Sequence, residues 1–247
     1  MSKINLSLVA GALLAGAAPA AAFIVNIDTN LVTNGNFEAG KSGFTSDYTY
    51  TAPGSNALQP EATYTVDYNP NTSHPAFAAF GDHTSGDGLF MIVNGSSTLD
   101  AAVWTSGSIA LTPGTTYNFG AFLSTLYPDS PASLSFTITY NNFLQADGGK
   151  FRNAFQSLGA QSLGLFNAPS TTGVWAGFST SFIAEGDSAV FSIINRNTAA
   201  QGNDFGIDDI TLAAAGVPEP ATWAMLLSGF GLVGVAARRR RPGMIAA

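Results

Sequence analysis

The segment Ser133–Tyr140 alternates strictly between hydroxyl side chains and large apolar ones. A period of two places the apolar set, from Leu134 to Tyr140, on one face of a β-strand. The segment therefore predicts a strand with one buried face. No long segment has helical spacing, and the best helix candidate, Gly149–Leu158, is short.

Further stretches share this β-type pattern and are separated by Gly, Asn, Pro and Asp, which favour turns. They are Tyr48–Thr51, Thr63–Tyr68, Gly88–Val93, Val103–Leu111, Thr116–Ser124, Val174–Phe182, Ala189–Asn195 and Phe205–Leu212. This many short strands predicts an all-β fold, a jelly-roll β-sandwich.

Composition excludes several classes of protein. The chain of 247 residues has no cysteine, which excludes a disulfide framework, a thiolate zinc site and a Cys nucleophile. Its formal net charge is −7. An acidic chain lacks the basic surface that neutralises phosphates, so we expect no nucleic-acid partner.

The N-terminus has the pattern of a secretory signal peptide. Lys3 precedes the apolar run Leu6–Ala18, and small residues follow up to Ala22. We therefore predict a signal helix over residues 1–22, removed after Ala22 or one or two residues earlier. A transmembrane anchor is the alternative, but the apolar run is short for a span of about 20 residues.

Three parts follow one another at the C-terminus: Pro-Glu-Pro at 218–220, an uncharged apolar stretch at 221–237 and four arginines at 238–241. At 1.5 Å per residue the stretch is about 26 Å long, which predicts a short transmembrane helix. The arginines favour the cytoplasmic side, so residues 242–247 form a cytoplasmic tail and the body lies outside. The two prolines leave the motif itself extended. An ordinary single-span anchor is the alternative.

This order of parts resembles the PEP-CTERM sorting signal of Gram-negative bacteria, in the variant written PEPxxWA, over residues 217–241. The residues that carry the resemblance are Pro218, Glu219, Pro220, Trp223, Ala224, Gly229, Gly231, Arg238, Arg239, Arg240 and Arg241. The resemblance implies a membrane protease-transpeptidase, exosortase, as partner. It implies an exported protein that is anchored in the inner membrane before processing and then reaches the cell surface or an extracellular, exopolysaccharide-containing biofilm matrix.

The remaining body, residues 23–216, is expected to be one β-sandwich domain. It contains four of the nine basic residues and 15 of the 16 acidic ones. Such a body is repelled by anionic surfaces and has the charge to hold divalent cations.

Two segments of the body resemble the opening and closing strands of carbohydrate-binding-module-like, galactose-binding-like jelly rolls. They are Asn30–Gly40 and Asn203–Leu212, and the resemblance extends over roughly Leu31 to Leu212. Gly81–Gly88 resembles an internal element of secreted members with a sorting tail. The region Leu144–Ala168 departs from the pattern because it is longer than a simple strand connection.

The resemblance implies a structural calcium ion between the two ends of the sandwich, and no other cofactor. Its implied ligands are Glu38 and Asp208, with Asp209 as an alternate and Asn36 supplying a backbone oxygen. Adjacent strand residues face opposite ways, so one aspartate is expected at the core edge and the other toward solvent. The alternative is that Glu38 and Asp208 only cap turns.

Other polar and aromatic residues allow two interpretations each. His74 and His83 are the only histidines, and no nucleophile motif accompanies them, so a loop role is favoured over chemistry. Asp82 and Asp87 lack the full spacing of an EF-hand calcium loop. The remaining aromatic residues fit either the core or a sugar-stacking surface, and we favour the core for Trp104, Trp175, Tyr48, Tyr50, Tyr64 and Tyr68.

Three functional classes follow from these observations. The first is a non-catalytic surface or matrix protein, which we favour. The second is a lectin-like module with a defined glycan ligand, whose binding residues the sequence does not identify. The third is a glycan-active enzyme, which needs a pair of carboxylates in a cleft. Because the body contains only the glutamates Glu38, Glu61 and Glu185, we predict no catalytic residue.

Overall fold

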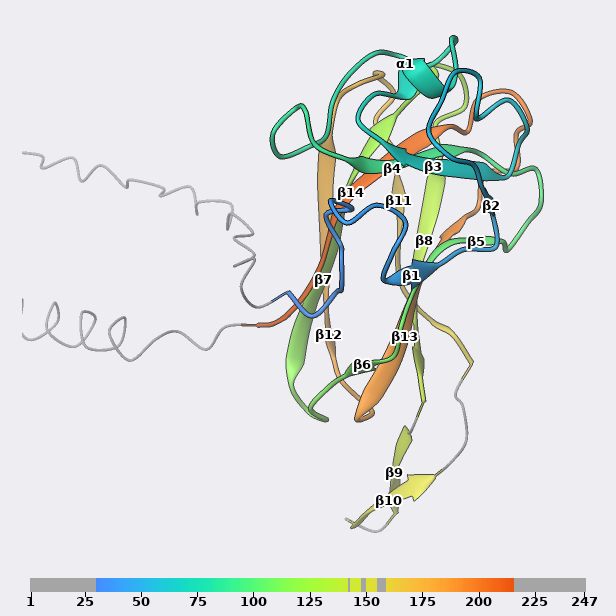
Figure 1. The fold of residues 1–247 in the computed structure, drawn as a ribbon. Helices are drawn as coiled ribbons and strands as arrows, with labels where there is room; N and C mark the ends of the chain where they lie inside the picture. The colour runs from blue at the N-terminus through green and yellow to red at the C-terminus, as the bar shows by residue number, and fades with distance from the viewer. Residues whose placement is uncertain (1–29, 142, 148–149, 155–158, 216–247) are drawn as a thin grey trace, which may run out of the picture.

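The computed structural model describes residues 30–141, 143–147, 150–154 and 159–215. Its strands form two sheets that pack face to face (Figure 1). In the first sheet the strand order is β1-β5-β13-β8-β11, and β6 also pairs with β13. In the second sheet the order is β12-β7-β14-β4-β3-β2. The predicted all-β sandwich is therefore correct.

The strands of the first sheet are β1 (Phe44–Thr45), β5 (Ala102–Ser106), β6 (Ile109–Ala110), β8 (Ser133–Tyr140), β11 (Gln161–Asn167) and β13 (Ser188–Asn195). Those of the second sheet are β2 (Thr49–Tyr50), β3 (Thr63–Asp67), β4 (Phe90–Asn94), β7 (Thr116–Thr125), β12 (Ala176–Ile183) and β14 (Phe205–Ala214). The bounds of the strands predicted from the sequence agree with these to within two residues, except that Val103–Leu111 is divided into β5 and β6.

A separate hairpin projects from one end of the sandwich (Figure 1). It consists of β9 (Phe143–Asp147) and β10 (Lys150–Ala154), which pair antiparallel. The helix candidate Gly149–Leu158 is therefore wrong over Lys150–Ala154, which is a strand. The pairing partner that makes this segment a strand precedes it in the sequence and has no clear alternation. The one helix among the described residues is α1 (Pro70–Ser73), which is a single turn.

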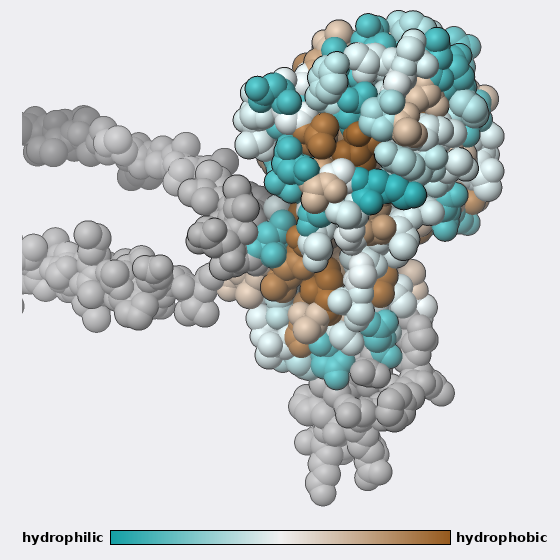
Figure 2. Space-filling model, in the orientation of Figure 1, coloured by the Kyte–Doolittle hydropathy of each residue, from teal (hydrophilic) through white to brown (hydrophobic). Residues whose placement is uncertain are grey.

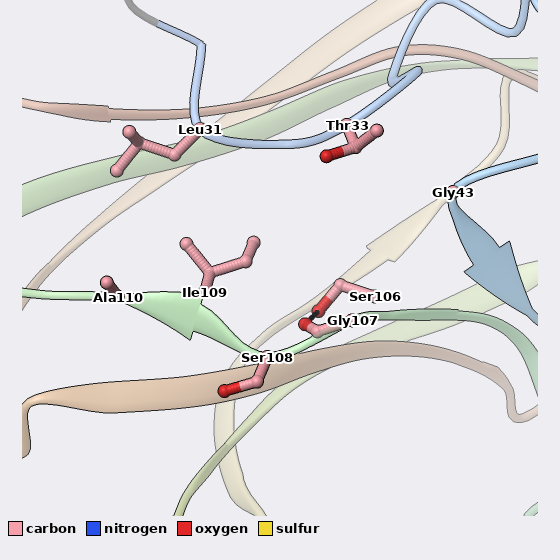
Figure 3. Close-up of a pocket in the computed structure, with 8 residues that line it drawn as sticks. All are labelled: Leu31, Thr33, Gly43, Ser106, Gly107, Ser108, Ile109 and Ala110. Atoms are coloured by element: carbon pink, nitrogen blue, oxygen red, sulfur yellow. Dashed lines mark hydrogen bonds between the residues drawn. The ribbon is translucent and has the colours of Figure 1, made fainter.

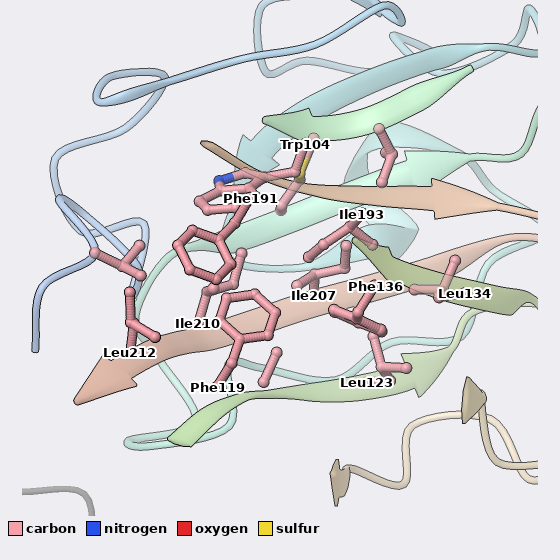
Figure 4. Packing of buried hydrophobic residues seen from close by; sticks show 14 of the residues in the cluster. Trp104, Phe119, Leu123, Leu134, Phe136, Phe191, Ile193, Ile207, Ile210 and Leu212 are labelled. Carbon is pink, nitrogen blue, oxygen red and sulfur yellow. The ribbon is translucent and has the colours of Figure 1, made fainter. Parts of the chain in front are cut away.

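The core lies between the sheets and contains the residues that alternate inward along each strand (Figure 4). Phe119 of β7 stacks on Phe191 of β13, with ring centroids 5.1 Å apart. Phe136 of β8 lies 4.1 Å from the ring of Phe178 of β12. Rings from both sheets thus interlock, and dispersion and apolar burial hold the two layers together.

A smaller apolar cluster lies on the outer face of the second sheet, under the loops. Phe90 and Ile92 of β4 point outward into it and are fully buried. Loop residues cover them, namely Leu58, Phe77, Phe80, Leu126, Tyr127 and Trp175. The loops at this end are therefore held by packing rather than left free in solvent.

The N-terminal segment runs back along β14. The N–H of Leu31 donates to the carbonyl of Leu212 at 2.8 Å, and the N–H of Ile210 donates to the carbonyl of Gly35 at 2.8 Å. A Cβ at Gly35 would lie 2.0 Å from the Ile210 carbonyl oxygen. Only glycine allows this approach, which joins the two ends of the domain.

Candidate functional site

Among the carboxylates whose burial the structure describes, Asp208 is the most buried, with 1% of its surface exposed. It lies on β14 between Ile207 and Asp209, and its side chain leaves the second sheet on the outer face. The main-chain N–H of His83 donates to its Oδ2 at 3.0 Å. Burial, followed by the charges of Asp209 and Asp82, raises the pKa of Asp208 to about 8, although the main-chain N–H groups of His83 and Asp209 donate to its carboxylate and oppose the rise.

Asp209 follows directly in a β-bulge. The register of β14 against β7 shifts between Asp208 and Thr211, and Asp209 has a φ of 48°. A bulge redirects a side chain that would otherwise face the opposite side. Asp208 and Asp209 therefore line the same pocket although strand alternation would separate them, and Asp209 is the more exposed of the two.

Asp82 organises the loop Gly81–Gly88. Its carboxylate accepts hydrogen bonds from the N–H groups of Thr84, Ser85 and Gly88 and from the Ser85 hydroxyl. Burial raises the pKa of Asp82, but these hydrogen bonds together outweigh it and hold the pKa below its usual range. The loop thus presents an ionised carboxylate beside Asp208.

Glu38 approaches this loop from the opening segment. Its Oε1 accepts the N–H of Leu89 at 3.0 Å. A Cβ at Gly88 would lie 2.4 Å from Glu38 Oε1 and 3.1 Å from Asp82 Oδ2. Glycine at this position therefore lets the two carboxylates converge on the loop.

These groups surround one pocket of about 290 Å³. Its lining comes from the opening segment, the Gly81–Gly88 loop and β14. The lining residues are Asn30, Val32, Asn34, Gly35, Asn36, Glu38, Asp82, Thr84, Ser85, Asp208, Asp209 and Thr211. All four residues implied as calcium ligands from the sequence lie here. Asp82 joins them, which sequence reasoning missed because it treated the loop separately.

The chemistry of the pocket suits a hard cation, since its polar groups are carboxylate, amide and hydroxyl oxygens. Within the residues that the structure describes, no three His, Asp or Glu side chains already meet in the arrangement of a metal site. Glu38 and Asp208 are also engaged with main-chain N–H groups, as the turn-capping alternative requires. An ion here would need backbone oxygens in addition to the carboxylates.

His83 lies at the edge of the pocket and packs against β7. Its ring stacks on Phe122, with centroids 3.4 Å apart, and its Nδ1 lies 2.7 Å from Asp209 Oδ2. The Thr84 hydroxyl donates to the same oxygen at 2.7 Å. These contacts hold the loop on the sheet, which agrees with a positioning role.

Most of the aromatic residues that fit either the core or a sugar-stacking surface are packed against other side chains. Trp104 is fully buried in the core, and Tyr48 and Tyr64 are 4% and 2% exposed. Tyr50 packs on Tyr64, with ring centroids 5.4 Å apart. Tyr68 is 53% exposed, so the core position favoured for it is wrong. Trp175 packs in the outer cluster and donates its indole N–H to Gly81. His74 packs on Phe77, and burial lowers its pKa.

The sandwich and the pocket define a class of protein: a β-sandwich whose two ends meet at an acidic pocket. The predicted signal peptide and sorting signal lie outside the described residues. No helix in the described part of the chain is long and apolar enough to span a bilayer.

The family model of the PEP-CTERM protein-sorting motif matches residues 216–241. The expected sorting signal is therefore confirmed, and the chain carries a PEP-CTERM motif at its C-terminus. This motif implies an exported protein that exosortase processes for the cell surface. No curated protein matches the chain.

Among solved structures, the body is similar to carbohydrate-binding modules. The CBM22-1 xylan-binding domain of Xyn10C from Paenibacillus barcinonensis is 12% identical, with a TM-score of 0.42, covering 74% of this chain and 93% of that one. A structure described as family 16 carbohydrate-binding module 2 is 19% identical, with a TM-score of 0.40 and coverages of 74% and 99%. A CBM4 structure is 16% identical, with a TM-score of 0.38 and coverages of 74% and 99%.

Proposed function

We propose that this chain is an exported, non-catalytic protein of the cell surface or of an exopolysaccharide-containing matrix, delivered by exosortase. The sorting motif carries the proposal. β14 ends at Ala214 and the motif begins at residue 216, so the folded body leads directly into the signal. We interpret the body as one jelly roll over residues 23–216, because most successive long strands alternate between the two sheets.

The carboxylates support a non-catalytic body. Asp82 holds its own loop through hydrogen bonds, and Asp208 is buried beneath that loop. Glu61 and Glu185 are exposed in loops, apart from the pocket. A glycosidase would instead need two carboxyl groups facing one another across a substrate cleft.

Surface display tests the proposal. Replacing Pro218, Glu219 and Pro220 together by alanine removes the motif that exosortase is expected to read. The protein should then stay in the membrane fraction and disappear from the surface, as followed by surface labelling of intact cells. Pro242→Ala lies beyond the arginines and should leave display unchanged. Normal display of the triple variant would contradict the proposal.

A lectin-like role is the second candidate, and a row of hydroxyl side chains on the first sheet favours it. The register aligns one residue from each of five strands, on the face opposite the core: Thr45, Thr105, Ser192, Thr137 and Ser162. The Thr105 hydroxyl donates to the Ser192 hydroxyl at 3.1 Å. Thr137 in the middle of the row is buried, and the hydroxyls on either side of it can hydrogen-bond a glycan chain lying across the strands.

Retention on polysaccharide gels distinguishes the two roles. A lectin would be retained, and the double variant Thr45→Arg and Ser162→Arg, at the two exposed ends of the row, would abolish retention. Ser179→Arg on the outer face of the second sheet is the matched control. A matrix protein without a defined glycan ligand would pass all gels in all three forms.

We also propose that the acidic pocket takes a structural Ca²⁺ ion. Glu38, Asp208 and Asp82 would supply carboxylate oxygens, with Asp209 as an alternate and Asn36 contributing its backbone oxygen. The ion would neutralise a charge that burial otherwise makes costly at Asp208. It would fasten the opening segment, the Gly81–Gly88 loop and β14 to one another. A chelator should then lower the melting temperature of the protein, and Glu38→Gln should abolish that sensitivity.

A further inference from the structure

A second hollow lies on the other side of the N-terminal segment, between that segment and β6 (Figure 3). Its volume is about 320 Å³. Leu31 and Thr33 line it on one side, the stretch from Ser106 to Ala110 lines it on the other, and Gly43 lies at one end. Leu31, which is 40% exposed, and Ile109 lie on opposite sides of it. Figure 2 shows brown, apolar surface on this side of the body, between β7 and β1.

The hollow coincides with an unfilled strand position in the first sheet. β5 and β6 follow one another along β13, and β1 covers the outer edge of β5 at Thr105 and Ser106. Beyond β1, no described strand pairs with the outer edge of Gly107–Ala110. Only Ile109 and Ala110 of this edge are strand residues, and Gly107 and Ser108 lead into them; four extended residues span about 13 Å. The Gly107 carbonyl accepts from the Ser106 hydroxyl, and the outward N–H and C=O groups that remain along this edge can pair with another strand.

The sequence directly before Asn30 contains a segment of suitable length and composition for such a strand. Phe23–Thr29 reads FIVNIDT, with three β-branched apolar residues and one aromatic residue in seven positions, which favours a strand. Fully extended it reaches about 23 Å. It joins the described chain at Asn30, whose side chain bonds to the Ile210 carbonyl and the Leu212 N–H. Its attachment point is therefore fixed on β14, and the next residue, Leu31, lines the hollow.

We propose that residues 23–29, once signal-peptide cleavage frees them, add a strand beside β6. The added strand buries alternate apolar side chains in the hollow against Leu31 and Ile109, and it continues the line of β1. Because it is tethered one residue away, docking is intramolecular and needs little affinity. Removal of the signal peptide thus allows the open edge of the sheet to gain a strand. The inference rests on the cleavage expected near Ala22.

Disulfide trapping tests this docking, because the chain has no native cysteine. Ala110→Cys is combined in turn with Ile24→Cys, Val25→Cys, Asn26→Cys and Ile27→Cys in the full chain, and the exported protein is treated with a mild oxidant. Disulfides require Cβ atoms about 3.5–4.5 Å apart. A docked strand should cross-link strongly at alternate positions and at least tenfold less at the positions between them. Ser179→Cys in place of Ala110→Cys is the control and should not cross-link.

Each other outcome overturns the proposal. Equal cross-linking at all four positions indicates a loose tether, and no cross-linking places the segment elsewhere. Disulfide-linked dimers in place of intramolecular bonds assign the edge to a second copy. The mass of the N-terminal peptide is measured in parallel. A product that begins near residue 23 without alternating cross-links contradicts docking alone, whereas a retained leader contradicts both docking and the expected export.

Discussion

The main-chain N–H of His83 donates to Asp208 Oδ2 at 3.0 Å, although 125 positions separate the two residues. This bond attaches the Gly81–Gly88 loop to the buried end of β14. Burial first, and then the charges of Asp209 and Asp82, raise the pKa of Asp208 to about 8. The pocket is therefore costly to ionise without a compensating cation, and the first prediction follows from this cost.

Ca²⁺ binding should strengthen as the pH rises from 6 to 8. The ion binds the deprotonated carboxylate, so with one proton released the apparent affinity should rise about tenfold per pH unit up to the pKa of Asp208. Calorimetric titration of the purified protein with Ca²⁺ at pH 6, 7 and 8 measures this slope. Glu38→Gln should weaken binding at every pH, whereas Glu185→Gln, in an exposed loop, should not. A pH-independent affinity would contradict the assignment of Asp208.

Asp204→Asn should stabilise the protein at pH 8 more than at pH 5. Burial raises the pKa of Asp204 to about 7, although the Gly95 N–H donates to its Oδ1 at 3.0 Å. Because the pKa of this carboxyl is higher in the folded than in the unfolded protein, its protonation stabilises the fold. This stabilisation is fully present below the unfolded pKa near 4 and is lost as the pH rises through the folded pKa of about 7. The amide carries no charge and escapes this loss.

The difference can reach a few kcal/mol, since one pKa unit corresponds to about 1.4 kcal/mol. Urea unfolding of the wild type and the variant at both pH values, with chelator present, measures it. The same stability difference at pH 5 and pH 8 would show that Asp204 does not titrate in this range.

Gly35→Ala should destabilise the domain far more than Gly40→Ala. At Gly35 the new Cβ would lie 2.0 Å from the Ile210 carbonyl oxygen, so the opening segment would have to leave β14. Gly40 has a φ of 65° and open space around it, so alanine there costs only the left-handed backbone, roughly 1–2 kcal/mol. Thermal unfolding compares the two variants, and equal losses would contradict the close approach.

The sandwich could be predicted because its central strands carry the signal locally. β8 alternates hydroxyl and apolar residues without exception, and its bounds agree with the prediction. β11 was missed because a register shift at Gly164 interrupts its alternation. β10 was mistaken for part of a helix because its strand character comes from pairing with β9, which local sequence does not reveal.

The pocket was only partly predictable for a similar reason. Asp208 and Glu38 stand in segments that resemble known opening and closing strands, so their convergence could be inferred. Asp82 belongs to an internal loop, and only the tertiary contact between His83 and Asp208 brings it there. The bulge at Asp209 overrides simple strand alternation, and no residue pattern in β14 announces it.

The mass of the protein recovered from the cell surface tests the central claim most directly. An exported exosortase substrate should begin near residue 23, end near Pro218–Pro220 and lack Arg238–Arg241. The intact chain of 247 residues, found dissolved in the cytosol and absent from the surface, would contradict the account.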